Sequence, residues 1–266
     1  MPARHPERIV CLTEETTETL YLLGEERRIV GISGYTVRPP RARKEKPRVS
    51  AFLSAKTEKI LELKPDLVLG FSDLQADIAR DLAKAGLNIM LFNQRSVDEI
   101  LSMILTLSCL VGVEEKGRKL IGELEANLES IRAAARAFTR KPKVYFEEWD
   151  EPMISAIRWV SELIEIAGGE DVFSERSLSQ SASGRIVADG NEVIRSAPEV
   201  IFGSWCGKKF RPEKVAARPG WGAIPAVKAN RLYEIKSAEI LQPGPAALTD
   251  GVRRIHDILR DLVQPQ

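Results

Sequence analysis

The sequence predicts an α/β protein made of two Rossmann-like lobes with parallel sheets, joined by one long backbone helix. Short apolar runs alternate with helical patterns in both halves of the chain. An amphipathic pattern from residue 114 to about 138 separates the halves. A segment around Pro65 is also echoed around Pro198, which indicates two lobes of similar design.

The first lobe is assigned to residues 1–95. Its strands are short apolar runs, as in a parallel sheet covered by helices on both faces. The predicted strands cover residues 8–12, 28–33, 48–50, 66–70 and 88–92, and the helices cover residues 13–23, 57–63 and 75–85. Thr13 is expected to cap the first helix and Gly86 to end the last.

Residues 96–140 are expected to link the lobes. One helix is predicted from residue 96 to about 111 and a second from 114 to about 138, with Leu124, Leu128 and Ile131 on its apolar stripe. About 25 residues at ~1.5 Å each span about 38 Å. This is too long for a crossover in a small sheet, so the second helix is interpreted as a strut.

The second lobe is assigned to residues 141–266. Its predicted strands cover residues 143–146, 199–202 and 231–235, and its helices cover residues 160–167 and 250–262. The echo pairs residues 58–70 with residues 191–203: a short helix runs into proline, and an acid, three apolar residues and glycine follow. Two such lobes predict a ligand cleft where the carboxyl ends of their strands face each other.

The charge balance excludes two classes of partner. Lysine and arginine number 39 against 38 acids, so no net field attracts nucleic acid or an anionic membrane. No run approaches the ~18 apolar residues of a membrane span, and no apolar leader precedes Ile9. A cytoplasmic location is therefore expected, or an extracytoplasmic one if a leader has been removed.

Several segments together resemble a known family. They are residues 8–20, 29–35, 64–68, the strut, 163–169 and 242–245. In this order they are similar to the helical-backbone (class III) substrate-binding proteins of ABC importers, and within that superfamily to the cobalamin-binding branch. The resemblance implies a small-molecule ligand between rigid lobes, no required cofactor and no catalysis. A corrinoid is the expected ligand, with haem, a siderophore or a metal chelate as alternatives.

The resemblance also implies contact with a permease. Importing members dock through one surface glutamate on each lobe, and these positions match Glu58 and Asn191. The second position lacks the charge, although Glu192 is adjacent, and Glu58 also suits an ordinary helix start. An importer subunit and a leaderless cytoplasmic relative that binds or hands over a ligand therefore both stay open.

Candidate ligand residues of the first lobe directly follow its strands. They are Glu14, Glu15, Tyr35, Phe52, Phe71, Asp73 and Asn93. For the two glutamates the alternative is a helix-start role, because the helix dipole favours acids there. For Tyr35 the alternative is packing on Pro39.

The second lobe contributes an unusual acidic and aromatic segment at residues 147–152. The candidates from this lobe are Glu148, Trp149, Arg158, Trp159, Trp205, Cys206, Glu239 and Gln242. Arg158 is expected near the acids and able to pair with them. Three tryptophans suit a flat, mostly apolar ligand better than an ion, and the alternative for the segment is an exposed acidic turn.

Other classes of function have less support in the sequence. His5 and His256 lie away from the predicted strand ends, with His256 on a surface helix, so no metal site is expected. No hydrolase elbow, zinc-protease motif, P-loop or dinucleotide fingerprint is present. An enzyme would have to use Cys206 as nucleophile with His256 as base. A pure interaction scaffold would instead require a large apolar surface patch.

Overall fold

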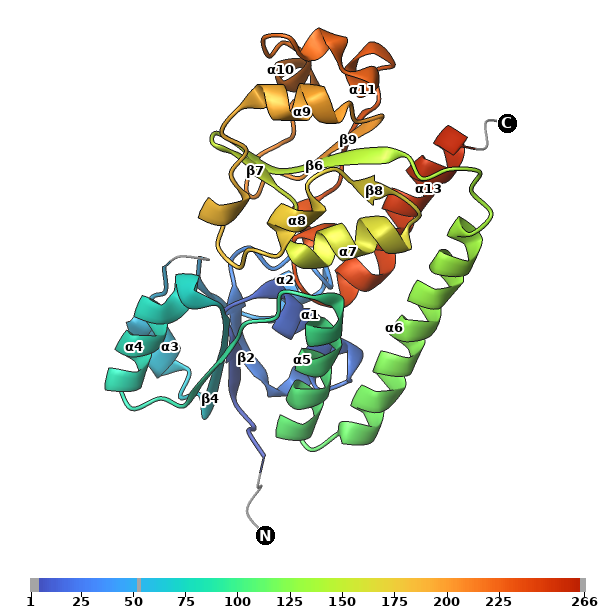
Figure 1. Cartoon of the computed structure of the whole chain (residues 1–266). Helices are drawn as coiled ribbons and strands as arrows, with labels where there is room; N and C mark the ends of the chain where they lie inside the picture. Colours follow the sequence, from blue (N-terminus) through green and yellow to red (C-terminus); the bar gives the residue numbers. More distant parts are fainter. Residues whose placement is uncertain (1–4, 52–53, 264–266) are drawn as a thin grey trace. The chain divides into compact units, whose positions relative to one another are not determined.

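The computed structural model describes residues 5–51 and 54–263, and the chain forms two compact units (Figure 1). Unit 1 comprises Met1–Gln94 and Asp98–Leu124, and unit 2 comprises Arg95–Val97 and Glu125–Gln266. Each unit is an α/β structure with its own sheet, which confirms the predicted fold class.

Unit 1 is built on a five-stranded parallel sheet with the order β3-β2-β1-β4-β5. Its strands are β1 (Ile9–Cys11), β2 (Ile29–Ser33), β3 (Arg48–Ser50), β4 (Leu67–Phe71) and β5 (Ile89–Phe92). Every residue of β1 and β4 is buried, as expected for central strands covered on both faces. In Figure 1, α3 and α4 cover one face of this sheet, and α1 and α5 lie on the other.

The helices of unit 1 follow the predicted order. They are α1 (Glu14–Leu22), α2 (Ala42–Glu45), α3 (Thr57–Glu62), α4 (Ala76–Lys84) and α5 (Val97–Leu110), with short 3₁₀ turns at Glu26–Arg28 and Asp73–Gln75. Thr13 occupies the N-cap position of α1, but its hydroxyl pairs with that of Thr16 at 3.1 Å and caps no backbone group. Gly86 ends α4 with φ +85°, as predicted.

The long helix α6 (Glu114–Ala135) confirms the predicted strut, although it ends three residues earlier than expected. Residues 114–124 belong to unit 1 and residues 125–135 to unit 2. Within unit 2, the Asn127 amide donates to the Leu248 carbonyl at 2.8 Å, and its oxygen accepts from Arg253 at 2.6 Å. Leu128 and Ile131 are buried, so the second half of α6 is part of the core of that unit.

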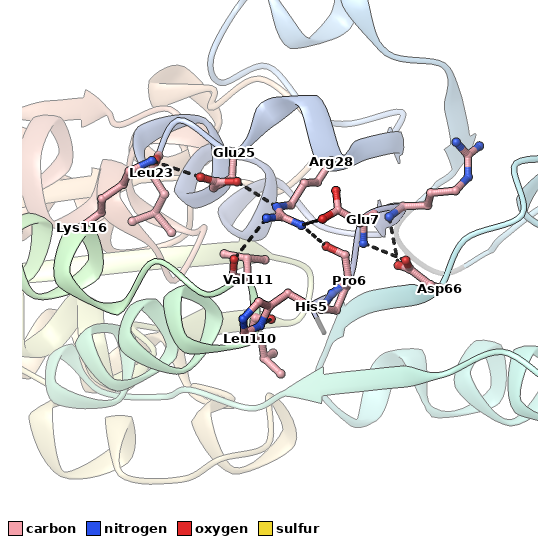
Figure 2. Close-up of polar contacts among 11 residues, drawn as sticks. His5, Pro6, Glu7, Leu23, Glu25, Arg28, Asp66, Leu110, Val111 and Lys116 are labelled. Atoms are coloured by element: carbon pink, nitrogen blue, oxygen red, sulfur yellow. Dashed lines mark hydrogen bonds and ion pairs between the residues drawn. The ribbon is translucent and has the colours of Figure 1, made fainter. Parts of the chain in front are cut away.

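The first half of α6 is tied to unit 1 by a polar network (Figure 2). Lys116 donates to the Leu23 carbonyl and to Glu25, at 3.0 and 3.1 Å. Glu25 also accepts from Arg28 at 2.8 Å, and Arg28 pairs with Glu7 at 2.7 Å. The network therefore joins α6, the turn after α1 and the segment that precedes β1.

Unit 2 is built on a mixed sheet with the order β10-β9-β6-β7, and β8 also pairs with β6. Its strands are β6 (Lys143–Asp150), β7 (Met153–Ser155), β8 (Glu170–Asp171), β9 (Val200–Gly203) and β10 (Leu232–Glu234). Only the β6–β7 pair is antiparallel among the described strands. This hairpin was not predicted, and it extends β6 four residues beyond the expected end.

The helices of unit 2 differ in length. They are α7 (Arg158–Ile166), α8 (Ser174–Ser177), α9 (Gly190–Ser196), α10 (Pro212–Ala216), α11 (Pro225–Lys228), α12 (Ser237–Ile240) and α13 (Val252–Val263), with 3₁₀ turns at Ser183–Arg185 and Trp221–Ala223 and a π-helical turn at Ala247–Gly251. Among the residues described, no helix is both long and apolar enough to cross a bilayer.

One prediction about α13 is wrong. His256 was expected on a surface helix, but its ring is buried, stacks on Phe138 at 5.3 Å between centroids and bonds to the Ala167 carbonyl at 3.1 Å. The imidazole therefore packs within unit 2, with its ring face against Phe138.

The echoed segments have the same local structure in both units. Lys64 and Ala197 each precede the proline, and both adopt a left-handed backbone with φ of 46° and 49°. The following strand is β4 in unit 1 and β9 in unit 2, and each pairs in parallel with the first strand of its unit. The sequence echo therefore corresponds to equivalent positions in two similar sheets.

Candidate functional site

The predicted residues of the first lobe lie along one edge of the unit 1 sheet. The strands are parallel, so the segments that follow them emerge at the same edge. The structure places Glu14, Glu15, Tyr35, Phe71, Asp73 and Asn93 there. Tyr35 is 55% exposed, and Asp73 and Asn93 are also exposed, whereas Phe71 is a buried residue of β4 itself. Phe52 lies outside the described residues.

Glu14 and Glu15 form the first turn of α1, and both are buried. Glu15 is only 1% exposed, and neither of its carboxylate oxygens has a hydrogen-bond partner among the described residues. Burial raises the pKa of Glu15 to about 7 although the Thr13 hydroxyl and the Glu15 backbone amide oppose the shift, and the neighbouring Glu18 adds to it. Burial, together with Glu15 and Glu18, raises the pKa of Glu14 to about 8.

This result changes the helix-start interpretation of the two glutamates. A helix dipole stabilises an exposed acid by about 0.3–1 kcal/mol, which is less than one pKa unit. Burial raises both pKa values by more than one unit. Desolvation therefore outweighs the helix dipole, and the ionised form of each glutamate is disfavoured. Near neutral pH this edge therefore offers carboxyl groups that can both donate and accept hydrogen bonds.

The acidic segment of unit 2 is not an exposed turn after a strand. Residues 147–150 are the last residues of β6, and Glu147 is 0% exposed. Its carboxylate accepts two hydrogen bonds from Arg218, at 2.5 and 2.9 Å, and one from the Trp205 indole at 3.1 Å. The Tyr145 hydroxyl also donates to it at 3.0 Å. Glu147 is therefore a fully partnered internal charge.

Glu148 points to the opposite face of β6 and belongs to a second ion pair. It accepts from Arg185 at 2.5 and 3.2 Å, and Arg185 also donates to the Ser155 carbonyl at 2.7 Å. Since the Arg185 side chain is only 2% exposed, this contact fixes the loop after α8 against the hairpin. The structure thus gives Glu148 a packing role, and ligand contact by Glu148 stays a prediction.

Trp149 and Trp205 come together around a lysine that was not among the predicted residues. The Lys208 ammonium lies 4.0 Å from the Trp149 ring centroid and 5.2 Å from that of Trp205. Lys208 also pairs with Asp150, the last residue of β6. Two aromatic rings and one ion pair therefore mark the carboxyl end of β6 and β9.

The remaining candidates of the second lobe are dispersed. Arg158 pairs with Glu162 one helical turn away, at 2.9 Å, and not with the acidic segment as expected. Trp159 is buried, and its indole donates to the Ile240 carbonyl at 2.9 Å. Cys206 is exposed in the loop after β9.

Glu239 and Gln242 are half-buried, in α12 and just after it. No described group of three or more histidine, cysteine, aspartate or glutamate side chains is arranged to hold a metal ion.

The sequence analysis did not identify Lys208 and Arg218, the two cations near the end of β6, for different reasons. Lys208 could have been found, because it lies three residues after Trp205 in the loop that follows β9. Arg218 is 71 residues from Glu147 along the chain and has no local signal that marks it as its partner.

The two positions matched to permease docking also differ in the structure. Glu58 is exposed in the first turn of α3. Glu192 occupies the first turn of α9, but it is half-buried and pairs with Arg176 at 2.5 Å. Asn191 is exposed, and its backbone N–H donates to the side chain of the N-cap residue Asp189. The exposed negative charge of the first unit has no equivalent at the matched position of the second.

Two α/β units that share a long helix, with polar and aromatic side chains at the carboxyl ends of their parallel strands, define a class of ligand-binding protein. The chain belongs to the periplasmic binding protein family, whose model matches residues 9–239. This result confirms the resemblance found in the sequence.

Individual relatives span nearly the whole chain. The chain is 27% identical over 264 residues to the vitamin B12-binding protein of Vibrio cholerae. The aligned region covers 96% of this chain and 89% of that protein. The chain is also 24% identical over 261 residues to the uncharacterised ABC transporter substrate-binding lipoprotein YvrC of Bacillus subtilis. This aligned region covers 95% of this chain and 79% of that protein.

A solved structure of similar fold is the periplasmic haem-binding protein RhuT from Roseiflexus sp., with a TM-score of 0.80 and 24% identity over 95% of this chain and 99% of that one. The chain is therefore a substrate-binding protein of the periplasmic binding protein family, similar in sequence to a vitamin B12-binding relative and in fold to a haem-binding protein.

Proposed function

We propose that this protein binds a corrinoid, such as cobalamin, and presents it to an ABC permease or to a cytoplasmic acceptor. The observation that carries the proposal is the pair of tryptophans at the carboxyl end of β6 and β9. Trp149 is half-buried and lies against the Lys208 ammonium, which also packs against the buried Trp205 ring. An aromatic face next to a charged group suits a large planar ligand with polar substituents. The similarity to vitamin B12-binding relatives supports the same ligand.

The acids of unit 1 also favour a corrinoid over haem. Corrinoids carry several amide side chains, and a carboxyl group can pair with an amide through two hydrogen bonds. Glu14 and Glu15 supply such groups, with pKa values of about 8 and about 7. Haem carries carboxylates at its rim, and these would be repelled once either glutamate ionises.

Metal coordination distinguishes the same two ligands. Haem iron is usually held by histidine, cysteine, methionine or tyrosine, whereas the cobalt of cobalamin has a lower ligand from its own nucleotide. Among the described residues, neither histidine follows a carboxyl end of a strand, because His5 precedes β1 and His256 lies in α13. Tyr35 and Cys206 are the exposed groups that a haem alternative would have to use.

The proposal does not include catalysis. The Cys206–His256 pair would need an accessible imidazole, but His256 is buried against Phe138. A Cys206→Ala variant should therefore bind the corrinoid as the wild type does. The docking role of Glu58 and Glu192 stays a prediction, with Glu58 as the stronger anchor because its carboxylate is exposed.

An absorbance titration tests the ligand. Purified protein is titrated with cobalamin, cobinamide and haem, and the same series is run on Trp149→Ala and on Leu178→Ala, an exposed apolar control in the same unit. Truncation of an aromatic anchor costs about 2 kcal/mol, so Trp149→Ala should weaken binding about 30-fold, and the control should not. The absence of a spectral and calorimetric change with either corrinoid would remove the corrinoid proposal.

A further inference from the structure

Unit 2 contains a lysine-rich recess that the proposed function does not explain. It has a volume of about 360 Å³ and lies where the chain leaves β9 and β10. The residues that line it include Trp205, which is buried, Glu234, and the lysines Lys208, Lys209 and Lys236. Three lysines and one glutamate thus line the same recess.

Two of the three lysines are already neutralised by partners. Lys208 pairs with Asp150 and Lys236 pairs with Glu234. Partial burial opposes the ionisation of Glu234, but hydrogen bonds from Lys236 and the Phe210 amide, with the nearby charges of Lys236 and Lys209, lower the pKa of Glu234. Glu234 is therefore ionised at neutral pH and holds Lys236 at the wall.

Lys209 is the positive charge in excess. It forms no ion pair within the part of the chain that the structure describes, although it lies near enough to Glu234 to affect its pKa. The loop that carries it turns at Gly207, which has φ +79° and open space where a side chain would be. The recess can thus accept a further anion without displacing an existing pair.

We propose that this recess is the subsite for an anionic substituent of the ligand, held next to Trp205 by Lys209 and by the remaining ammonium hydrogens of Lys236, which keeps its pair with Glu234. The inference rests on the proposed function and adds to it the part of the ligand that unit 2 recognises. A phosphate or a carboxylate has the required charge and acceptor oxygens. In cobalamin the group would be the phosphodiester of the nucleotide loop, and in haem it would be a propionate.

The recess is tested first without the large ligand. Inorganic phosphate is titrated into ¹⁵N-labelled protein at constant ionic strength, and the amide of Gly207 is followed by NMR. We expect a saturable shift in the wild type that is lost in Lys209→Gln/Lys236→Gln. It should be retained in Lys214→Gln/Lys228→Gln, which removes the same charge from exposed positions of unit 2. A shift that is equal in all three proteins, or absent from the wild type, overturns the proposal.

Matched ligands then identify the source of the anion. Calorimetry compares cobalamin with cobinamide, which lacks the nucleotide phosphodiester, and haem with its dimethyl ester. The Lys209→Gln/Lys236→Gln variant should weaken cobalamin about tenfold and leave cobinamide unchanged, since a charge-assisted pair contributes about that factor. The same contrast between haem and its ester would assign the subsite to a propionate.

The two proposals fail in different ways. If cobalamin and cobinamide bind the wild type and the double variant alike, the subsite is refuted and the corrinoid function stands. If no corrinoid binds but phosphate still shifts Gly207 in a Lys209-dependent way, the corrinoid function is refuted and the anion subsite stands.

Discussion

Glu15 offers a direct test of the electrostatics at the edge of unit 1. Burial moves its pKa from 4.5 to about 7. One pKa unit corresponds to about 1.4 kcal/mol, so the buried carboxyl costs the folded state roughly 3 kcal/mol once it must ionise. Because the pKa is higher in the folded state, the folded protein binds more protons between pH ~4.5 and ~7. The free energy of unfolding should therefore fall as pH rises through this window and level off above it.

The substitution Glu15→Gln removes the titrating group and keeps its shape. The variant should match the wild type near pH 4.5 and be more stable by roughly 3 kcal/mol at pH 8. Loss of the Glu15 charge also lowers the pKa of Glu14, which acts in the same direction. Urea unfolding from pH 4.5 to 8.5 should be followed by circular dichroism, because all four tryptophans lie in unit 2.

The exposed residue Glu58 provides the control. Glu58→Gln should leave the pH dependence of unfolding unchanged. If the curves of Glu15→Gln and the wild type run parallel across the whole range, the Glu15 carboxyl is not desolvated and the reasoning about this edge is wrong.

Two further predictions concern unit 2. Arg218→Met should destabilise the protein by about 3–5 kcal/mol, because it leaves Glu147 buried without its cation, and adding Glu147→Gln should recover much of the loss in denaturant titrations. Gly203→Ala should cost about 1–3 kcal/mol, since its methyl group would lie 1.9 Å from a phenylalanine ring. Gly222→Ala, with open space around it, should change the melting temperature little, and equal effects of the two alanines would contradict this packing argument.

The sequence predicted most of the fold because its signals are local. Short apolar runs identified β1, β2, β4 and β5 of unit 1, and the echo around Pro65 and Pro198 identified equivalent strands of the two units. The β6–β7 hairpin was missed because the second half of β6 is acidic, and carboxylates are depleted in strands. Partners distant in sequence make this segment stable as a strand.

The candidate site was predicted less completely than the fold. Strand ends located Glu14, Glu15, Trp149 and Trp205 at carboxyl edges, since this depends only on topology. The sequence could not show that Glu15 lacks a partner. Nor could it show that Arg218 neutralises an internal acid, because both facts depend on contacts between distant segments.

The shared helix α6 has a consequence for how the protein unfolds. Lys116 anchors its first half in one unit and Asn127 its second half in the other, with no proline or break between them. Helix formation is cooperative, so melting either half removes hydrogen-bonded turns that support the other. Calorimetry should therefore give a single heat-absorption peak, and the chain should behave as one thermodynamic unit although it contains two sheets.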